Sequence, residues 1–245
     1  MRLRIRYEKL GKVRFLSHRD VARVLERAVR RAGLPVAYSE GFSPHARLHF
    51  GLALSVGHES FAEYLDVDLV PAAPRPATHE VPALLSGCLP DGLTATAAVE
   101  LVPGTMSLQE SVTSSAWEFR VAGAPSAELI AAAEELLAAD ELPVEITRKG
   151  KQVREDLRPL LLDLSTEATS YGARLRVELG TKPRSVRPAE FLAALGARCP
   201  SPGPGAEACA EARVLRTHQW ITHDGVRREP IELAAPSPHA VERAS

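Results

Sequence analysis

Residues 2–8 of the chain, RLRIRYE, alternate strictly between polar and apolar side chains. A period of two places the arginines on one face of a strand and the apolar residues on the other. The following segment changes to a helical period, with Ser17 at the N-cap position, Asp20 three residues later and Gly33 at the end. This pattern predicts a half-buried strand followed by a helix that packs on its apolar face.

Strand-like and helix-like periods continue to alternate as far as residue 101. Strands are predicted at 35–39, 47–55, 62–70 and 93–101, and a short helix is predicted near 79–88. This order of elements is close to that of a ferredoxin-like unit with one added strand. Residues 103–115 are polar and show no periodicity, which predicts a linker.

The second half of the chain repeats this order of elements. Strands are predicted at 117–122, 143–148, 158–164, 173–179 and 212–218. Ser126 is the predicted N-cap of one helix, and a second helix has Pro188 in its first turn and ends at Gly196. The segment 199–211 is rich in Gly and Pro and is predicted to be irregular. We therefore expect an α+β fold of two tandem ferredoxin-like domains with antiparallel sheets. The expected divisions are a basic N-terminal domain at 1–102, the linker at 103–115, a second domain at 116–220 and an irregular or disordered tail at 221–245.

Composition argues against several classes of protein. No apolar run approaches the roughly 20 residues that span a bilayer, and the first residues lack the apolar segment of a signal peptide. Cys88, Cys199 and Cys209 are too few and too widely spaced for a disulfide framework, a cysteine-rich metal site or an iron–sulfur cluster. No phosphate-binding glycine motif or Ser-His-Asp pattern is present. We expect a cytoplasmic protein that contacts no membrane and holds no cofactor.

Charge is divided unevenly along the chain. Residues 1–50 hold twelve Lys and Arg but four acids, a formal charge of +8, whereas the remainder has a formal charge of −9. A basic face of this kind suits a polyanionic partner such as RNA. The alternative is that the two halves of the chain neutralise one another when packed.

Two groups of basic residues are candidate RNA contacts. They are Arg19, Arg23, Arg27 and Arg31, which recur every four residues on the predicted helix, and Lys149 and Lys151, which flank Gly150 at the tip of a predicted hairpin. Each group has a plainer interpretation as a solvated basic surface. The arginines of strand 2–8 also have an alternative role, because Asp66 and Asp68 alternate in the same way on another strand and predict cross-strand salt bridges.

The segment 38–51, YSEGFSPHARLHFG, combines turn residues with aromatics. Its Gly and Pro residues predict a tight loop, from which Phe42, His45 and Arg47 are the side chains expected to project. The spacing of its histidines does not give a one-sided ligand set, so we expect no metal site. His18 or His45 could act as a general base in RNA cleavage, but no partner group is readable from the spacing.

The sequence at 13–20, 34–60 and 63–69 resembles a family of uncharacterised bacterial proteins called radical-SAM-linked. The best-matching positions are Phe15, Ser17, His18, Asp20, Tyr38, Gly41, Phe42, Pro44, Phe50, Gly51 and Gly57. The resemblance implies a partner, a radical SAM protein encoded separately, and an accessory role near RNA processing or modification. It supplies no catalytic residues, and the chain lacks the three-cysteine motif of the radical enzyme itself.

Three hypotheses for function follow. The leading one is an RNA-binding accessory or adaptor protein, without catalytic activity of its own, that works with a radical SAM partner. The second is a metal-independent endoribonuclease, because the tandem layout is similar to that of CRISPR repeat-processing endoribonucleases, although their glycine-rich loop is not evident here. The third is a protein–protein docking module for the radical SAM enzyme.

Overall fold

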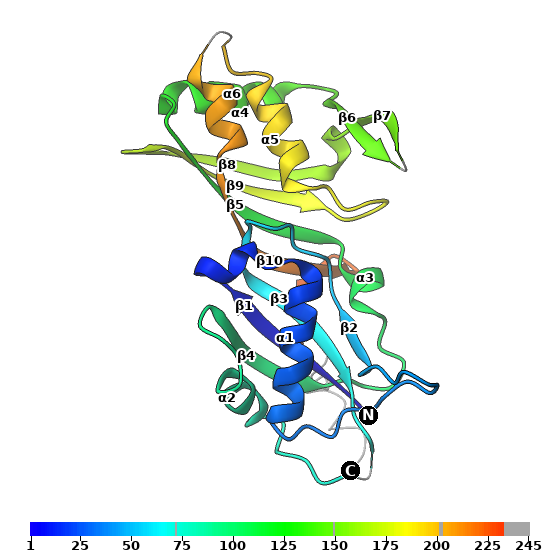
Figure 1. The fold of residues 1–245 in the computed structure, drawn as a ribbon. Helices are drawn as coiled ribbons and strands as arrows, with labels where there is room; N and C mark the ends of the chain where they lie inside the picture. Colours follow the sequence, from blue (N-terminus) through cyan, green and yellow to red (C-terminus); the bar gives the residue numbers. More distant parts are fainter. Residues whose placement is uncertain (72, 149, 201–202, 233–245) are drawn as a thin grey trace. The chain divides into compact units, whose positions relative to one another are not determined.

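The computed structural model of the chain describes residues 1–71, 73–148, 150–200 and 203–232. It has a mixed α+β fold with mostly antiparallel sheet and, in the described residues, six α-helices. The chain forms two compact units (Figure 1). One contains Met1–Val112 and the residues from Gln219 on, and the other contains Thr113–His218. No helix in the described residues combines the length and the apolar character needed to cross a membrane.

The N-terminal unit is built on a sheet, and its two longer helices pack on one face of it. Its elements are β1 (Arg2–Lys9), the 3-10 helix η1 (Gly11–Phe15), α1 (His18–Arg31), β2 (Leu48–Phe50), β3 (Glu59–Asp68), α2 (Val81–Ser86), β4 (Leu93–Glu100), α3 (Leu108–Ser111), the end of β10 (Arg213–His223) and β11 (Val226–Arg228). The strand order is β4-β1-β3-β10, with β2 paired to β3 and β11 paired to β10. The strands β2, β1 and β4 pair with their neighbours in antiparallel fashion.

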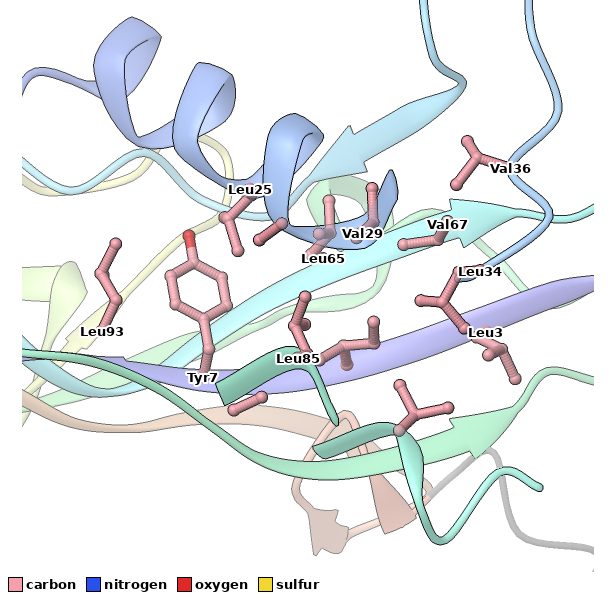
Figure 2. Close-up of a cluster of buried hydrophobic side chains, with 14 of the residues drawn as sticks. Leu3, Tyr7, Leu25, Val29, Leu34, Val36, Leu65, Val67, Leu85 and Leu93 are labelled. Atoms are coloured by element: carbon pink, nitrogen blue, oxygen red, sulfur yellow. The ribbon is translucent and has the colours of Figure 1, made fainter. Parts of the chain in front are cut away.

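The core of this unit lies between the sheet and the helices α1 and α2, as Figure 2 shows. Leu3 and Tyr7 point from β1 toward the helices, and Leu25 and Val29 point from α1 toward the sheet (Figure 2). Each of these side chains is almost fully buried, which stabilises the fold by about 1.5–3 kcal/mol per large apolar residue. The burial of one helical face leaves the opposite face of α1, including its arginines, in solvent.

The C-terminal unit has its own sheet and helices. Its elements are β5 (Ser114–Ala122), α4 (Ser126–Ala138), β6 (Pro143–Arg148), β7 (Lys151–Asp156), the 3-10 helix η2 (Arg158–Leu160), β8 (Leu161–Thr169), β9 (Gly172–Gly180), α5 (Pro188–Gly196), α6 (Pro204–Ala210) and the beginning of β10. The strand order is β10-β5-β9-β8, and β6 and β7 form a separate hairpin. Phe119 of β5 packs against Phe191 of α5, with ring centroids 4.9 Å apart.

Three segments of the N-terminal half differ from the sequence predictions. Residues 35–39 form only isolated bridges, Val36 to Leu69 and Tyr38 to Ala46, because the chain turns back on itself instead of continuing as a strand. The strand predicted at 47–55 is limited to Leu48–Phe50. The segment 103–115 is not wholly irregular, since it contains α3 and the start of β5.

Further differences lie in the second half of the chain. The Gly- and Pro-rich segment 199–211 contains α6, which starts at Pro204, a residue suited to the first turn of a helix. Ser126 is the first residue of α4 and not its N-cap, which is Pro125. Residues 221–228, predicted as part of an irregular tail, form the end of β10, a turn and β11. Residues 233–245 of that tail lie outside the described part of the chain.

Candidate nucleic-acid interface

The start of α1 is fixed by a cap formed by two side chains. The Oγ atom of Ser17 accepts a hydrogen bond from the backbone N–H of Asp20 at 3.2 Å and donates one to the Asp20 carboxylate at 2.6 Å. The hydrogen bond from Ser17 lowers the pKa of Asp20. This cap satisfies an N–H group of the first turn and sets the rotation of the helix, so that Val21 and Leu25 enter the core.

The four arginines predicted to form a stripe are exposed on the outer face of α1. They are Arg19, Arg23, Arg27 and Arg31. Arg23 lies 3.6 Å from the carboxylate of Asp20, a long contact between two well-exposed groups. Among the described residues, no carboxylate lies within ion-pair distance of the other three guanidinium groups. The stripe runs for about 18 Å along the helix axis, and its positive charge is mostly uncompensated.

A shallow cavity of about 550 Å³ lies along this face of the helix. It is lined by Leu16, Asp20, Arg23, Val24, Glu26, Arg27 and Arg30. Glu26 pairs with Arg30 at 3.1 Å, and Arg27 donates a hydrogen bond through Nε to the carbonyl of Arg23. The cavity is therefore lined by two apolar residues, three arginines and two carboxylates, so its lining has a net charge of +1.

The loop between α1 and β2 has a closed stem and an exposed tip. The N–H of Ser39 donates to the carbonyl of His45 at 2.9 Å, and the N–H of His45 donates to the Ser39 hydroxyl at 3.0 Å. Gly41 has a φ of +119°, a conformation that a residue with a side chain rarely adopts. Phe42 is fully exposed. The sequence prediction of a tight loop with projecting side chains is confirmed for Phe42, His45 and Arg47, all of which are exposed.

The end of this loop contacts the start of the arginine helix. Phe50 of β2 meets the ring of His18 edge-on, with ring centroids 5.1 Å apart and an interplanar angle of 79°. Leu48 and Phe50 are partly buried and pack against the core. Phe50, in the strand that follows the loop, therefore contacts the first residue of the helix that carries the arginine stripe.

The two candidate general bases have separate surroundings. His18 packs on Phe50, and the ring of His45 has no hydrogen-bond partner in the part of the chain that the structure describes. His49, which the sequence placed in the same histidine group, lies 3.2 Å from the carboxylate of Asp68. The described residues include no group of three or more His, Cys, Asp or Glu side chains that could hold a metal ion.

The arginines of β1 form salt bridges, as the cross-strand pattern predicted. Arg4 binds Asp66 through two hydrogen bonds, and Arg2 binds Asp68 at 2.6 Å. Arg6 pairs with Glu229, a partner that the sequence did not indicate. Pro230 also accepts a hydrogen bond from Arg4 through its carbonyl. Residues Glu229 and Pro230 thus occupy Arg6 and Arg4 on this face, so these two arginines are not available to phosphates, whereas the side chain of Arg2 stays 35% exposed at the edge of the sheet.

The basic hairpin belongs to the C-terminal unit. Strands β6 and β7 pair as predicted, and Gly150 has a φ of +77°, which suits a tight turn. Lys151 is exposed at the start of β7. Lys149 lies outside the described residues.

The chain matches the model of one protein family. Residues 2–188 match the model of a family described as uncharacterized protein conserved in bacteria, DUF2344. No curated protein matches the chain. The family's description names no partner enzyme, so the expected association with a radical SAM protein stays a proposal. Since the matched residues include all of the arginine helix and its loop and most of the chain, the protein belongs to the DUF2344 family.

Proposed function

We propose that the protein is an RNA-binding accessory protein, which uses the outer face of α1 and the loop 38–47 of the N-terminal unit. The observation that supports this most directly is the stripe of arginines on α1. Three of its four guanidinium groups, those of Arg19, Arg27 and Arg31, have no carboxylate within ion-pair distance among the described residues, although the chain as a whole is slightly acidic.

The energetics of the stripe favour an external anion. Each like-charged pair at i,i+4 destabilises the helix by about 0.2–0.5 kcal/mol, and the stripe contains three such pairs. The two acids of α1 itself, Asp20 and Glu26, are held by Ser17 and Arg30. A row of phosphates would neutralise the repulsion and release counterions, which supplies most of the free energy of nonspecific RNA binding.

We also infer that both units are ferredoxin-like. In the N-terminal unit the order β4-β1-β3, with β2 beside β3, supports this topology, with α1 and α2 as the two helices. In the C-terminal unit the order β10-β5-β9-β8 supports it, with the hairpin β6–β7 as an insertion. Because Glu229 and Pro230 occupy Arg6 and Arg4 on the opposite sheet face, we assign RNA binding to the helical side of the N-terminal unit.

The proposed partner is a separately encoded radical SAM protein, and RNA processing or modification is the proposed setting. This part of the proposal rests on the resemblance at 13–20, 34–60 and 63–69. The endoribonuclease hypothesis gains no support from the site, because no titratable group of the described residues is hydrogen-bonded to the ring of His18 or His45.

Binding of a structured RNA at increasing salt concentration tests the proposal. If all four arginines of the stripe contact phosphates of a single strand, log K should fall against log salt with a slope of about −3. The double variant Arg23→Glu/Arg27→Glu should weaken binding at least tenfold and flatten the slope. Arg120→Glu/Arg176→Glu on exposed positions of β5 and β9 makes the same change in net charge and is the control.

Two outcomes would reject the proposal. One is equal RNA affinity of the α1 double variant and the control. The other is absence of RNA affinity together with co-purification of a protein partner that survives nuclease treatment, which would favour the docking module.

A further inference from the structure

A cavity of about 550 Å³ opens at the ends of three strands of the N-terminal unit. β1 begins beside it, and β3 and β4 end beside it. Ala37 and Arg47 lie in its lining, and they are joined by a hydrogen bond from the N–H of Arg47 to the carbonyl of Ala37 at 2.9 Å. The loop that presents Phe42 therefore starts and ends at the rim of this cavity.

Two arginines and a histidine surround the Asp68 carboxylate, which lies in the lining of this cavity. Asp68 accepts hydrogen bonds from Arg2 through Nε at 2.6 Å and through Nη2 at 3.3 Å. The Nε atom of Arg47 lies 3.3 Å from the same carboxylate, and Nε2 of His49 lies 3.2 Å from it. The cluster has a net charge of +1 when His49 is neutral and +2 when it is protonated.

The carboxylate positions the arginines and leaves part of their donor capacity free. Each guanidinium has five N–H groups, and Asp68 has two oxygens to share among three partners. The terminal Nη groups of Arg47 have no acceptor among the described residues, and its side chain is 54% exposed. Arg47 is thus held at one edge of its guanidinium group while the other edge is open to a ligand.

The remaining walls of the cavity are largely apolar. They include Val70, Pro71, Leu101, Val102 and Pro103. Val70 and Val102 are among the exposed large hydrophobic residues of the protein. A cavity of this volume with apolar walls and a few charged groups at one end has the usual build of a small-molecule site.

We propose that this cavity binds a phosphomonoester attached to a planar or apolar body, with the phosphate at Arg2 and Arg47 and the body against Val70 and Val102. A phosphomonoester carries close to two negative charges at neutral pH and three acceptor oxygens, which can take N–H donors from both arginines at once. Arginine forks also bind phosphate oxygens in a bidentate manner.

The phosphomonoester could belong to a free nucleotide or to the 5′ end of an RNA strand. In the second case the inference rests on the proposed RNA-binding function, and in the first it stands independently. The two sources are separated by using both ligands. Adenosine 5′-monophosphate is compared with adenosine, and a 5′-phosphorylated oligoribonucleotide is compared with the 5′-hydroxyl form of the same sequence.

Isothermal titration calorimetry on the full chain measures both comparisons. The phosphorylated member of at least one pair should bind about tenfold more tightly than its partner, the effect of one charge-assisted contact. Arg47→Gln should remove this difference without changing the affinity for the unphosphorylated member. Arg120→Gln, a matched loss of one exposed arginine in the C-terminal unit, should leave the difference intact.

The results separate the failure of this inference from that of the proposed function. Equal affinities within both pairs overturn the inference, even if α1 variants still weaken RNA binding. A phosphate-dependent difference that persists in Arg47→Gln also overturns it. Binding of the mononucleotide that is lost in Arg47→Gln, with no binding of either oligonucleotide, supports the cavity and rejects the RNA proposal.

Discussion

Arg4 and Asp66 form a two-pronged ion pair in the interior of the N-terminal unit, with Nε–Oδ1 and Nη2–Oδ2 distances of 2.7 and 2.8 Å. Both side chains are essentially inaccessible to solvent. The carbonyl of Pro230 accepts a further hydrogen bond from Arg4. The guanidinium group of Arg4 therefore has acceptors from β3 and from Pro230, and only the folded chain brings these acceptors together.

Removing one partner of this pair should be costly. Asp66→Asn leaves the Arg4 charge buried and uncompensated, so the free energy of unfolding in urea should fall by about 3–5 kcal/mol. The double change Arg4→Met/Asp66→Leu should recover most of that loss. Asp163→Asn, at an exposed position of β8, is the control. A loss below about 1 kcal/mol in Asp66→Asn would contradict the assignment, since that is the range of an exposed pair.

The helix cap at Ser17 should contribute measurably to stability. Ser17→Ala removes the acceptor of the Asp20 N–H, so we expect a loss of about 1 kcal/mol in the free energy of unfolding. Ser43→Ala, in the exposed part of the loop, should change it by less than about 0.5 kcal/mol. Equal effects of the two substitutions in urea titrations would show that the cap is not stabilising.

Asp68 should make the protein sensitive to acid. Burial acts to raise its pKa, but hydrogen bonds from Arg2 and His49 outweigh burial and hold the pKa below its usual value of 3.8. A carboxylate with a lowered pKa in the folded state stabilises the fold above its ordinary pKa, and this contribution is lost as the pH falls through the lower value. Between about pH 5 and pH 2 the wild type should therefore lose more stability than Asp68→Asn. Parallel losses in the two proteins, measured by urea unfolding at each pH, would contradict this.

Phe42 should matter for binding but not for folding. Because the side chain is fully exposed, Phe42→Ala should leave the free energy of unfolding within about 0.5 kcal/mol of wild type. If a base stacks on the ring, the same change should weaken RNA binding by about 1–3 kcal/mol. Val56→Ala removes another exposed apolar side chain and serves as the control. Unchanged RNA affinity in Phe42→Ala would remove the loop tip from the interface.

The cysteines should differ strongly in reactivity. Burial, with the neighbouring Cys199 thiol, raises the pKa of Cys209 to about 12, and burial also raises the pKa of Cys199. Cys88 is only partly buried. Alkylation of the folded protein at pH 8, followed by mass spectrometry, should label Cys88 first and the other two only in urea. Early labelling of Cys209 would contradict the burial of α6 against its unit.

The elements that could be predicted from the sequence are those specified by neighbouring residues. The helix α1 was predicted with its cap and its end because Ser17, Asp20 and Gly33 are local signals. The Arg4–Asp66 pair was foreseen because both strands alternate with a period of two. The exposure of the arginine stripe followed from the burial of the opposite face of the same helix.

The features that were missed depend on distant parts of the chain or on weak local signals. The partner of Arg6, Glu229, is 223 residues away, and no periodicity indicates such a contact. The cavity of about 550 Å³ beside Arg2 and Arg47 combines the ends of strands that are remote in sequence. The turn between β10 and β11 did have a signal, because Asp224 and Gly225 both have positive φ and form the dipeptide favoured in tight hairpins.

The strand β10 begins in the C-terminal unit and ends in the N-terminal unit, where Gln219 donates a hydrogen bond to the carbonyl of Ala62. The N-terminal unit is thus assembled from two stretches of chain, Met1–Val112 and the residues from Gln219, which lie on either side of the C-terminal unit in the sequence. Pro230 and Glu229 contact Arg4 and Arg6, respectively. During synthesis, both residues leave the ribosome only after the whole C-terminal unit has been made. Until then Arg4 lacks its contact with Pro230, and the N-terminal unit reaches its native state only after translation of the second unit is complete.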